Sequence, residues 1–407
     1  MSWPKNSPDT EIPPEIRDAT LHFADSDRQA GFEISDDFRP FSQMNDMFTR
    51  AFWDPAVNGP DAMGFFKSYR MDATPRRGEG FSQKDFALRN AAWLVSDIIS
   101  NRGTAEGLRE GFQAPIASDT PVAPIKPDLG PPDAEAAEIK RIAKLFGADL
   151  VGITEFDPRW QYSERPDTRD MTPVPNDLPL GLTHVIVMGH AMDFDLVDTY
   201  PSALAGASTG REYSHEAAIV MQLAAYIRNL GYRAVASMND TALVIPYAIK
   251  AGLGEYGRNQ MVLTPEFGPR VRFSKVFTDM PLGVDAPRQR GLSTYCSECT
   301  VCAKACPPKA LPLGAPEFGS DSPSTIKGVK KWSANCEKCF GYWAKLKTDC
   351  AICMRVCPFN RRYDRLSDRI WRRLALSRFR AFARKWASRS PRDRLKPRDW
   401  WARRPLE

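Results

Sequence analysis

The stretch Tyr295–Leu311, YCSECTVCAKACPPKAL, decides how this chain can fold. Its four cysteines follow one another at spacings of three, three and four residues, and a proline comes directly after the last. Five more cysteines lie between Cys336 and Cys357, and the rest of the chain contains none. The order C-x2-C-x2-C-x3-C-P is typical of bacterial ferredoxins with two iron–sulfur clusters, in which the fourth cysteine binds the other cluster. The spacing therefore predicts two [4Fe–4S] clusters.

Disulfides and zinc are the two alternatives for such a group of cysteines. Disulfide-rich chains are usually short and secreted. This chain has 407 residues, and its first thirty contain no apolar run of the kind that a secretory leader needs. Structural zinc usually takes two ligand pairs separated by a longer loop, which does not describe the observed spacing. Iron–sulfur ligation in a reducing compartment is the better interpretation.

The five cysteines from Cys336 to Cys357 end in a second motif, C-x2-C-x3-C-P, which runs from Cys350 to Pro358 and lacks the first cysteine of a ferredoxin motif. The missing ligand must therefore come from farther upstream in the chain. If the fourth cysteines cross over, one cluster is held by Cys296, Cys299, Cys302 and Cys357. The other is held by Cys306, Cys350, Cys353 and one further thiolate, from Cys336 or Cys339. One of the nine cysteines is then spare, and we expect it to be a buried thiol without function rather than a redox switch.

The composition is that of a globular chain of two or three domains, with 43% hydrophobic and 26% charged residues. No apolar stretch approaches the roughly 18 residues that a membrane-spanning helix needs. The net charge of +6 is unevenly distributed, because residues 361–407 carry 17 Lys and Arg against 5 Asp and Glu. The body of the chain is therefore mildly acidic, and the basic excess belongs to a C-terminal tail.

The basic tail predicts an amphipathic helix with five large apolar side chains near one side: Trp371, Leu374, Phe379, Phe382 and Trp386. Such a helix can lie on an anionic membrane surface. Alternatively, it packs on the body of the protein or on the second subunit of a homodimer, and the sequence favours neither interpretation over the other. Binding of nucleic acid is less well supported, because positive charge alone is unspecific.

Residues 1–132 form an N-terminal region that is rich in aromatic residues and proline and has no catalytic motif. It contains one expected helix, FSQKDFALRNAAWLVSDIISNR, and a proline-rich extended arm at 111–132. From residue 133 to about 290, helix and strand patterns alternate, which indicates a layered α/β domain. We expect helices near 133–147, 213–230 and 241–252, and strands near 149–154, 182–190, 232–238, 260–264, 270–274 and 275–279.

The glycines of GLGEYG follow a helix and precede a strand, the reverse of the Rossmann order. A helix end followed by a tight turn explains them better than a dinucleotide site does.

Four segments, taken in order, resemble the corrinoid-dependent reductive dehalogenases: GYRAVASMND, AGLGEYGRNQMVLTPEFGPRVRFSKVFTDMPL, YCSECTVCAKACP and TDCAICMRVCPFN. The resemblance covers roughly residues 133–362. It implies an α/β fold in which a nitroreductase-like cobalamin-binding core (133–290) is followed by a ferredoxin-like domain with two [4Fe–4S] clusters (291–362). The N-terminal region 1–132 and the basic tail 363–407 flank these two domains.

The resemblance also implies roles for individual residues. Tyr213, in REYSHEAA at the start of the expected long helix, corresponds to the active-site tyrosine of the family, and Asn239 corresponds to the asparagine beside the substrate. The basic residue that tunes the tyrosine is Arg272 or Lys275. The candidate cofactor contacts are Gly252, Gly254 and Gly257.

Cys339, in CFGYW, corresponds to the remote cluster ligand of the family, which leaves Cys336 as the spare cysteine. No Asp-x-His-x-x-Gly motif is present, by which other cobalamin proteins place a histidine below the cobalt. We therefore expect the four histidines, at positions 22, 184, 190 and 215, to serve in packing or on helix surfaces, and the cobalt to have no histidine ligand from the protein.

The implied reaction replaces the halogen of a small organohalide by hydrogen. Cob(I)alamin supplies two electrons to the carbon–halogen bond, the clusters return electrons to cobalt one at a time, and the tyrosine supplies the proton. A tyrosine with a pKa of about 10 is a slow acid until a nearby cation stabilises the phenolate. The electrons come from an external low-potential donor, which is a ferredoxin, a flavodoxin or a reductase.

Exported members of this family carry a twin-arginine leader. Here the pair Arg76–Arg77 lies deep in the chain and is followed by GEGFSQKD, not by an apolar region. The sequence therefore predicts a cytoplasmic enzyme, whose basic tail is the candidate contact with the inner face of the membrane.

Two other functions stay open. An epoxyqueuosine reductase, which acts on tRNA, would share the AGLG turn and the cysteine pattern, but its usual tyrosine–histidine pair is absent because Ser214 follows Tyr213. A ferredoxin-like electron carrier without a substrate would not need the roughly 280 residues that precede the clusters.

Overall fold

The computed structural model describes residues 12–69, 78–105, 107, 121–176, 178–320, 322–389 and 393–403. Two features considered above fall outside the described residues: the pair Arg76–Arg77, and residues 111–120 of the proline-rich arm. Residues 121–131 of that arm form neither helix nor strand, and the amide of Ala123 donates to the carbonyl of Arg228 at 2.8 Å. This part of the arm therefore lies along the core.

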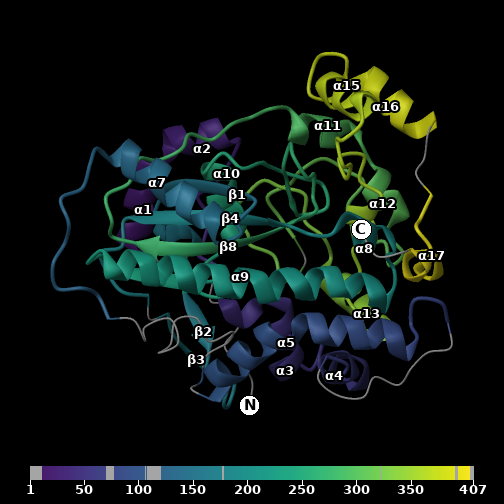
Figure 1. Ribbon diagram of the computed structural model, residues 1–407, viewed down its shortest axis with the longest axis horizontal. Coiled ribbons are helices and arrows are strands. Elements are labelled where there is room, and N and C mark those ends of the chain that lie inside the picture. Colours follow the sequence, from purple (N-terminus) through teal and green to yellow (C-terminus); the bar gives the residue numbers. More distant parts are fainter. Residues whose placement is uncertain are drawn as a thin grey trace.

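A four-stranded antiparallel sheet forms the centre of the fold, with the strand order β1-β4-β8-β5 (Figure 1). The strands are β1 (Leu150–Glu155), β4 (His184–Ala191), β8 (Val271–Thr278) and β5 (Ala234–Ser237). Separate strands were expected at 270–274 and 275–279, which is wrong, because β8 pairs with β4 along its whole length without a break. Two short antiparallel hairpins accompany the sheet: β2 (Glu164–Pro166) with β3 (Pro173–Pro175), and β6 (Glu255–Tyr256) with β7 (Val262–Leu263).

Helices cover both faces of the sheet and bury its apolar side chains. One face packs against α7 (Pro132–Leu145) and α9 (Ala203–Asn229). The other face packs against α10 (Val244–Lys250), η2 (Pro158–Trp160) and the N-terminal helices α1 (Pro14–His22) and α2 (Ala24–Ala30). Because successive residues of a strand point to opposite faces, β8 presents side chains to both of these layers.

The long helix α9 begins at Ala203, not near Tyr213 as expected. Ser202 caps it, since its hydroxyl accepts a hydrogen bond from the amide of Ala205. The first turns, ALAGASTG, are small residues apart from Leu204 and lack the periodic large apolar side chains that indicate a helix. They allow a close neighbour: a Cβ at Gly210 would lie 2.3 Å from the indole of Trp93, on the helix α5 (Gln83–Ala105) that runs beside α9 (Figure 1).

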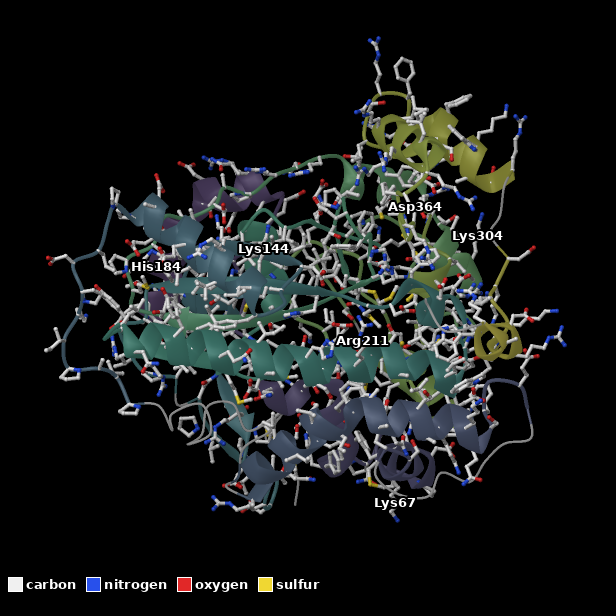
Figure 2. All side chains as sticks on the ribbon, in the orientation of Figure 1. Lys67, Lys144, His184, Arg211, Lys304 and Asp364 are labelled. Atoms are coloured by element: carbon white, nitrogen blue, oxygen red, sulfur yellow. The ribbon has the colours of Figure 1, made fainter. Side chains whose placement is uncertain are left out.

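Short helices carry most of the cysteines: α11 (Leu292–Glu298), α12 (Val301–Ala305), α13 (Cys336–Leu346) and α14 (Ile352–Arg355). The N-terminal helices α3 (Met47–Trp53) and α4 (Pro60–Lys67) pack on α13 through a cluster of apolar side chains. Among the residues described before the tail, the remaining elements are η1 (Gln43–Asn45) and α8 (Phe194–Asp198). Charged side chains cover the outside, as Lys67, Lys144, Lys304 and Asp364 illustrate (Figure 2).

The basic tail forms two adjacent helices, α15 (Leu366–Ala375) and α16 (Arg380–Arg389), and a third, α17 (Pro397–Ala402). The single helix expected here is wrong, because residues 376–379 form a turn. Trp371, Leu374 and Trp386 pack against residues 291–362, which we call the cysteine-bearing segment. In contrast, Phe379 and Phe382 are 52% and 60% exposed. In the described part of the chain, no helix combines the length and the apolar character that a membrane crossing requires.

Candidate functional site

Tyr213, Asn239 and Arg272 meet between α9 and the sheet. The side-chain amide of Asn239 donates to the Tyr213 hydroxyl at 2.5 Å. The guanidinium carbon of Arg272 lies 3.3 Å from the centroid of the tyrosine ring, and its Nη2 donates to Asn239 Oδ1 at 3.4 Å. A phenol, an amide and a cation thus converge, although they come from α9, from the segment after β5 and from β8.

Glu216 holds the guanidinium of Arg272 in place. It lies three residues after Tyr213 on α9 and is fully buried. Its Oε1 accepts a hydrogen bond from Arg272 Nη2 at 3.1 Å. Residues three apart on a helix share one face, which is why the carboxylate and the phenol both reach the same arginine. Glu216 was not predicted as a site residue, although its position three residues after Tyr213 can be read from the sequence.

His190 lies directly opposite Arg272 on the neighbouring strand β4. Its Nε2 shares a hydrogen bond of 2.7 Å with the hydroxyl of Ser274. Burial, followed by the charges of Arg272 and His215, lowers the pKa of His190 to about 3. A neutral imidazole at ordinary pH suits the packing role that we expected for this histidine.

Lys275 occupies a different environment from Arg272. The two residues are three positions apart on β8, so they point to opposite faces of the sheet. The buried ammonium of Lys275 donates to the carbonyls of Met238 at 2.7 Å and Asp240 at 3.0 Å. These two carbonyls flank Asn239, and the lysine therefore anchors the segment that carries the asparagine.

An aromatic wall from the N-terminal region completes this site. The ring of Trp93, on α5, lies 4.4 Å from that of Tyr213 with an angle of 31° between the planes. The ring of Tyr69 lies 5.0 Å from Trp93, edge to face, and the guanidinium of Arg89 lies 4.1 Å above Tyr69. We predicted no site residue in this region, and its only signal in the sequence was an abundance of aromatic residues.

The first group of cysteines lines a small cavity together with Tyr295 and Phe359: Cys296, Cys299, Cys302 and Cys357. Burial raises the pKa of Cys296 to about 12 and that of Cys302 to about 11. Arg258 is buried beside them, and its Nε donates to the carbonyls of Cys296 and Cys299 at 3.2 and 2.8 Å. The arginine of the AGLGEYGRN segment thus holds the loop that carries these thiols.

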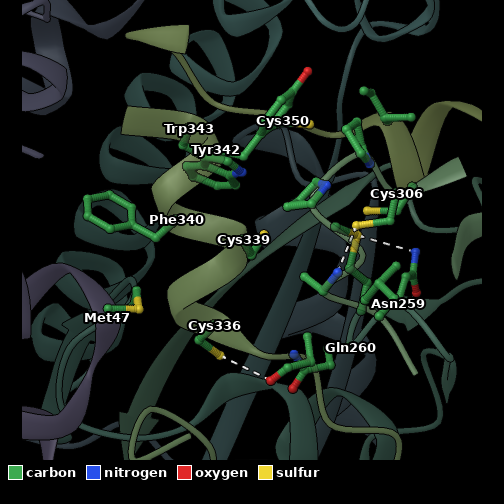
Figure 3. A pocket seen from close by; sticks show the side chains of 18 of the residues that line it. Met47, Asn259, Gln260, Cys306, Cys336, Cys339, Phe340, Tyr342, Trp343 and Cys350 are labelled. Atoms are coloured by element: carbon green, nitrogen blue, oxygen red, sulfur yellow. Dashed lines mark hydrogen bonds between the residues drawn. The ribbon is translucent and has the colours of Figure 1, made fainter. Parts of the chain in front are cut away.

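The second group of cysteines lines a cavity of about 200 Å³ (Figure 3). It comprises Cys306, Cys336, Cys339, Cys350 and Cys353. Burial raises the pKa of Cys339 and of Cys350 to about 12. Across the part of the chain that the structure describes, no three Cys, His, Asp or Glu side chains converge closely enough to hold a single metal ion.

Cys336 and Cys339 begin the same helix, α13, but their surroundings differ. The sulfur of Cys336 lies 3.6 Å from the hydroxyl of Thr325 and 3.6 Å from the carbonyl of Ser324. In contrast, the neighbours that raise the pKa of Cys339, after burial, are the thiols of Cys350, Cys336 and Cys306. Cys336 therefore lies at the edge of the group, and Cys339 lies within it (Figure 3).

A third cavity, of about 320 Å³, lies between the N-terminal region, the core and the cysteine-bearing segment. Tyr162 lines it and donates from its hydroxyl to the backbone carbonyl of Asn239 at 3.0 Å. Gln260 lines both this cavity and that of the second cysteine group. The cavity therefore adjoins both sites, and none of the four histidines, all of which the structure describes, lines it.

The three glycines proposed as cofactor contacts do not line this third cavity. Gly252 has a positive φ of 72° and ends the turn after α10, as the sequence predicted, beside a separate polar cavity of about 170 Å³. A Cβ at Gly254 would lie 2.4 Å from the carbonyl of Leu263, and one at Gly257 would lie 2.8 Å from Asn259. Close packing in the turn therefore accounts for these glycines, while their neighbours Glu255 and Tyr256 do line the third cavity.

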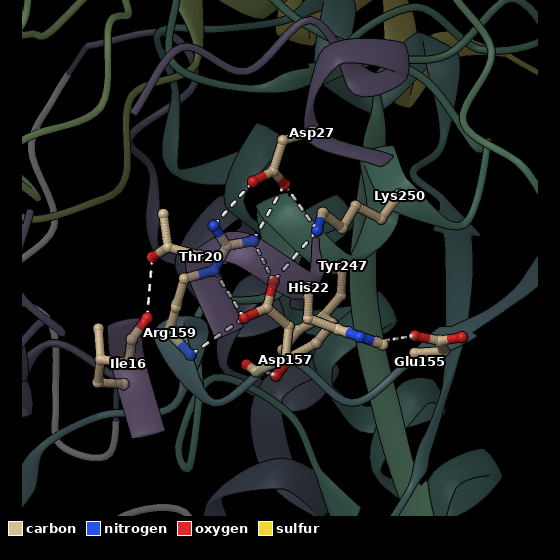
Figure 4. A network of polar contacts seen from close by, with 9 residues as sticks. All are labelled: Ile16, Thr20, His22, Asp27, Glu155, Asp157, Arg159, Tyr247 and Lys250. Atoms are coloured by element: carbon tan, nitrogen blue, oxygen red, sulfur yellow. Dashed lines mark hydrogen bonds and ion pairs between the residues drawn. The ribbon is translucent and has the colours of Figure 1, made fainter. Parts of the chain in front are cut away.

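A buried network of charges joins the N-terminal region to the core beside this cavity (Figure 4). Arg159 contacts Asp27 and Asp157 at 2.7 Å each, and Lys250 contacts the same carboxylates at 2.7 and 3.1 Å. The four side chains are at most 9% exposed. Asp27 comes from α2, and the chain directly after this helix, at Gly31 and Phe32, forms part of the cavity wall.

Comparisons with known proteins relate this chain to the reductive dehalogenases. The family model of the reductive dehalogenase subunit matches residues 167–282. A tetrachloroethene reductive dehalogenase of Sulfurospirillum multivorans is 35% identical over 269 residues, which cover 59% of this chain and 54% of that protein. An epoxyqueuosine reductase of Listeria monocytogenes is 32% identical over 132 residues, covering 31% of this chain and 33% of that protein. The chain spans about half the length of the curated dehalogenases that it matches.

Among solved structures, the catabolic reductive dehalogenase NpRdhA superposes with a TM-score of 0.68 at 24% identity, covering 88% of this chain and 47% of that one. A further structure, described as bearing on B12-dependent dehalogenation, gives a TM-score of 0.67 at 23% identity with the same coverage.

The molecule is thus a mixed α/β protein with the fold of the reductive dehalogenases. The sequence similarity relates it to the reductive dehalogenase family, as its motifs had indicated.

Proposed function

We propose that this protein is a reductive dehalogenase that carries out the reaction R–X + 2 e⁻ + H⁺ → R–H + X⁻ on a small organohalide. One observation carries the proposal: the Tyr213 hydroxyl is held by Asn239 while the guanidinium of Arg272 lies against its ring. Such an arrangement prepares a phenol to release a proton, because a cation at its face stabilises the phenolate that remains. The name of a relative with 35% identity supports a chlorinated alkene as one kind of substrate.

In this proposal the proton leaves Tyr213 Oη for the carbon that loses the halide. Asn239 orients the hydroxyl, and Arg272 stabilises the resulting anion. Glu216 keeps the guanidinium beside the ring, and Lys275 anchors the segment that carries Asn239. Trp93 adds an apolar face to the site, which excludes water and suits a carbon–halogen bond better than a hydrated ion.

We propose further that residues 133–290 form a nitroreductase-like core that holds a corrinoid, with the third cavity as part of its binding site. At about 320 Å³ the cavity can take part of such a group, and it suits one because it is aromatic in part and adjoins both Asn239 and the second cysteine group. Trp160, Tyr162 and Tyr256 would hold the corrinoid without a histidine ligand. When bound, a corrinoid supplies a low-valent cobalt that provides the electron pair for cleavage of the carbon–halogen bond.

Residues 291–362 would form a ferredoxin-like domain with two [4Fe–4S] clusters. In such a cluster each thiolate binds a different iron at the corner of a cage, so thiols spread around a cavity are suitable ligands. The first cluster would be held by Cys296, Cys299, Cys302 and Cys357. The second would be held by Cys306, Cys339, Cys350 and Cys353. Burial disfavours thiolates without a cation, and the irons would supply that positive charge.

Anaerobic reconstitution with corrinoid, iron and sulfide, followed by an assay of halide release, tests the proposed reaction. Reduced methyl viologen serves as the electron source, and brominated and chlorinated phenols and alkenes serve as substrates. Halide release that depends on added corrinoid is the expected result. A fully loaded protein that releases no halide but reduces epoxyqueuosine in tRNA would assign the chain to that function instead. Loaded protein with neither activity would favour the third function, that of an electron carrier without a substrate.

A further inference from the structure

The helices α15 and α16 form a basic cap on the first cysteine group. We define the basic cap as residues 361–389. Trp371, fully buried at its centre, lies 6.0 Å from the ring of Tyr295 and 5.2 Å from that of Phe359. Tyr295 precedes Cys296, and Phe359 lies two residues after Cys357. A single layer of aromatic side chains therefore separates the cap from the proposed first cluster.

The outward face of the basic cap is strongly positive. Its exposed cations include Arg365, Arg369, Arg373, Arg378, Lys385 and Arg389. The cap carries only two acidic residues, Asp364 and Asp368, and Asp368 pairs with Arg361. Ion pairs of Arg384 with Glu298 and of Arg362 with Asp195 attach the cap to the body. The positive face is therefore held in a defined position over the first cysteine group.

A chain of contacts links Tyr213 to the second cysteine group. Tyr213 contacts Trp93, Trp93 contacts Tyr69, and Tyr69 contacts Arg89. Arg89 in turn donates to the carbonyl of Lys347, three residues before Cys350 of the second group. Asn259 lines both the cavity of the first cysteine group and that of the second. The two groups are therefore adjacent, and the first lies on the side of the cap.

We propose that the outward face of the basic cap docks an acidic one-electron carrier protein of the ferredoxin or flavodoxin kind, which reduces the first cluster. This inference rests on the proposed clusters. In each docking event the reduced centre of the carrier loses one electron, and the cluster held by Cys296, Cys299, Cys302 and Cys357 gains it. Two such events supply the two electrons that each released halide requires, and no proton moves at this step.

The positive face matches an acidic protein, and the packing of large apolar side chains of the cap on the protein favours this occupant over a lipid surface. An amphipathic helix binds a membrane through its apolar face, but Trp371, Leu374 and Trp386 of the cap already pack on the protein. Four apolar side chains of the cap stay exposed among its cations: Leu366, Ile370, Phe379 and Phe382. A positive patch of this kind steers and orients an acidic partner. Because the patch lies over the first cysteine group, a partner that docks there comes close to the proposed first cluster.

A charge-reversal experiment with the full-length, iron–sulfur-loaded protein tests this surface. The variant Arg373→Glu/Arg378→Glu reverses two exposed charges of the cap. The control Arg141→Glu/Lys144→Glu reverses two exposed charges on α7, away from the cap (Figures 1 and 2). The probe is a reduced plant-type [2Fe–2S] ferredoxin, a small acidic protein. Stopped-flow spectroscopy measures the rate of cluster reduction, and the rate with reduced methyl viologen is the reference for each protein.

We expect the ratio of the ferredoxin-driven to the viologen-driven rate to fall about tenfold or more in the cap variant at low ionic strength. The α7 control should keep the wild-type ratio, and added salt should shrink the difference. Equal ratios in all three proteins would overturn the docking surface. A cap variant that loses binding to phosphatidylglycerol vesicles, or loses self-association, but keeps its ferredoxin-driven rate would also overturn it.

The readout separates this inference from the proposed reaction. Cluster reduction is observed directly, so a protein that accepts electrons at the cap but releases no halide would refute dehalogenation and support the docking surface. A protein that releases halide with viologen but keeps its ferredoxin-driven rate after the cap substitutions would support dehalogenation and refute the docking surface.

Discussion

The guanidinium carbon of Arg272 lies 3.3 Å from the centroid of the Tyr213 ring, and the same arginine is paired with the buried carboxylate of Glu216. The three charged or ionisable groups thus form one unit between α9 and β8. A cation near a phenol favours the phenolate, and an anion near the cation opposes that effect. This arrangement sets how readily Tyr213 gives up a proton, and it leads to the first two predictions.

Removal of the Tyr213 hydroxyl should abolish most of the proposed activity. Tyr213→Phe keeps the ring and its contact with Trp93, so iron content and corrinoid binding should persist. Turnover should fall by roughly 10² to 10⁴, the typical effect of losing a general acid. Halide release with reduced methyl viologen provides the measurement. A variant with full activity would show that another group delivers the proton.

Substitutions of Arg272 and Glu216 should shift the pH profile of turnover in opposite directions. Arg272→Gln removes the cation, so the alkaline limb of the profile should move upward, because the phenol stays protonated to higher pH. Turnover should also fall, on the order of 10². Glu216→Gln removes the opposing anion and should move the same limb downward. Shifts of the same sign in both variants would contradict this electrostatic account, since two merely disrupted sites have no reason to differ in sign.

Cys336 and Cys339 should differ in their effect on iron content. The reconstituted wild type should hold about eight iron atoms and about eight acid-labile sulfides per chain. Cys336→Ala should keep them, since this thiol lies at the edge of its group beside Thr325 and Ser324. Cys339→Ala should lose about half. Iron and zinc analysis after anaerobic reconstitution decides the outcome, and stoichiometric zinc with little iron would rule out both clusters.

Loss of one carboxylate from the buried charge network should destabilise the whole chain. Asp27→Asn leaves Arg159 and Lys250 with a single shared carboxylate, that of Asp157. The free energy of unfolding should fall by about 3–5 kcal/mol, the usual cost of breaking a buried ion pair. Urea denaturation measures this change. Asp25→Asn is the matched control on the same helix, because Asp25 is 79% exposed and solvent screens its pair with Arg28.

His190 should make the protein less stable in mild acid. Its pKa is about 3 in the folded protein, against 6.5 for an unperturbed histidine. Between these values the unfolded chain binds more protons, so the stabilisation is complete above pH 6.5 and is lost as the pH falls toward 3. The free energy of unfolding should drop by up to about 1.4 kcal/mol per pH unit more steeply than in His190→Gln. Urea titrations at pH 7, 6 and 5 compare the two proteins.

Several elements followed from local sequence pattern alone. The amphipathic period of residues 133–147 predicted α7, and the apolar runs predicted β1, β4 and β5. The cysteine spacing divided seven thiols into two sets and left the choice between Cys336 and Cys339 open. The two cavities separate the seven thiols in the same way, and both Cys336 and Cys339 line the second. The start of α9 was missed, because its first turns consist of small residues whose helical state depends on packing against α5. The tail was predicted as one helix, since the turn at 376–379 contains neither glycine nor proline.

The sequence by itself determined which chemical groups this protein has and how they are spaced: nine cysteines in two groups, a tyrosine, an asparagine and two basic residues. Only the tertiary structure shows which of Arg272 and Lys275 lies against Tyr213. Both lie in one strand, and the alternation of side chains turns one toward Tyr213 and uses the other to hold the backbone around Asn239. The tertiary structure also brought Trp93 and Glu216 to the site and the basic cap onto the first cysteine group. Spacing along a chain sets which face of an element a side chain occupies, but only the packing of distant elements decides what that face meets.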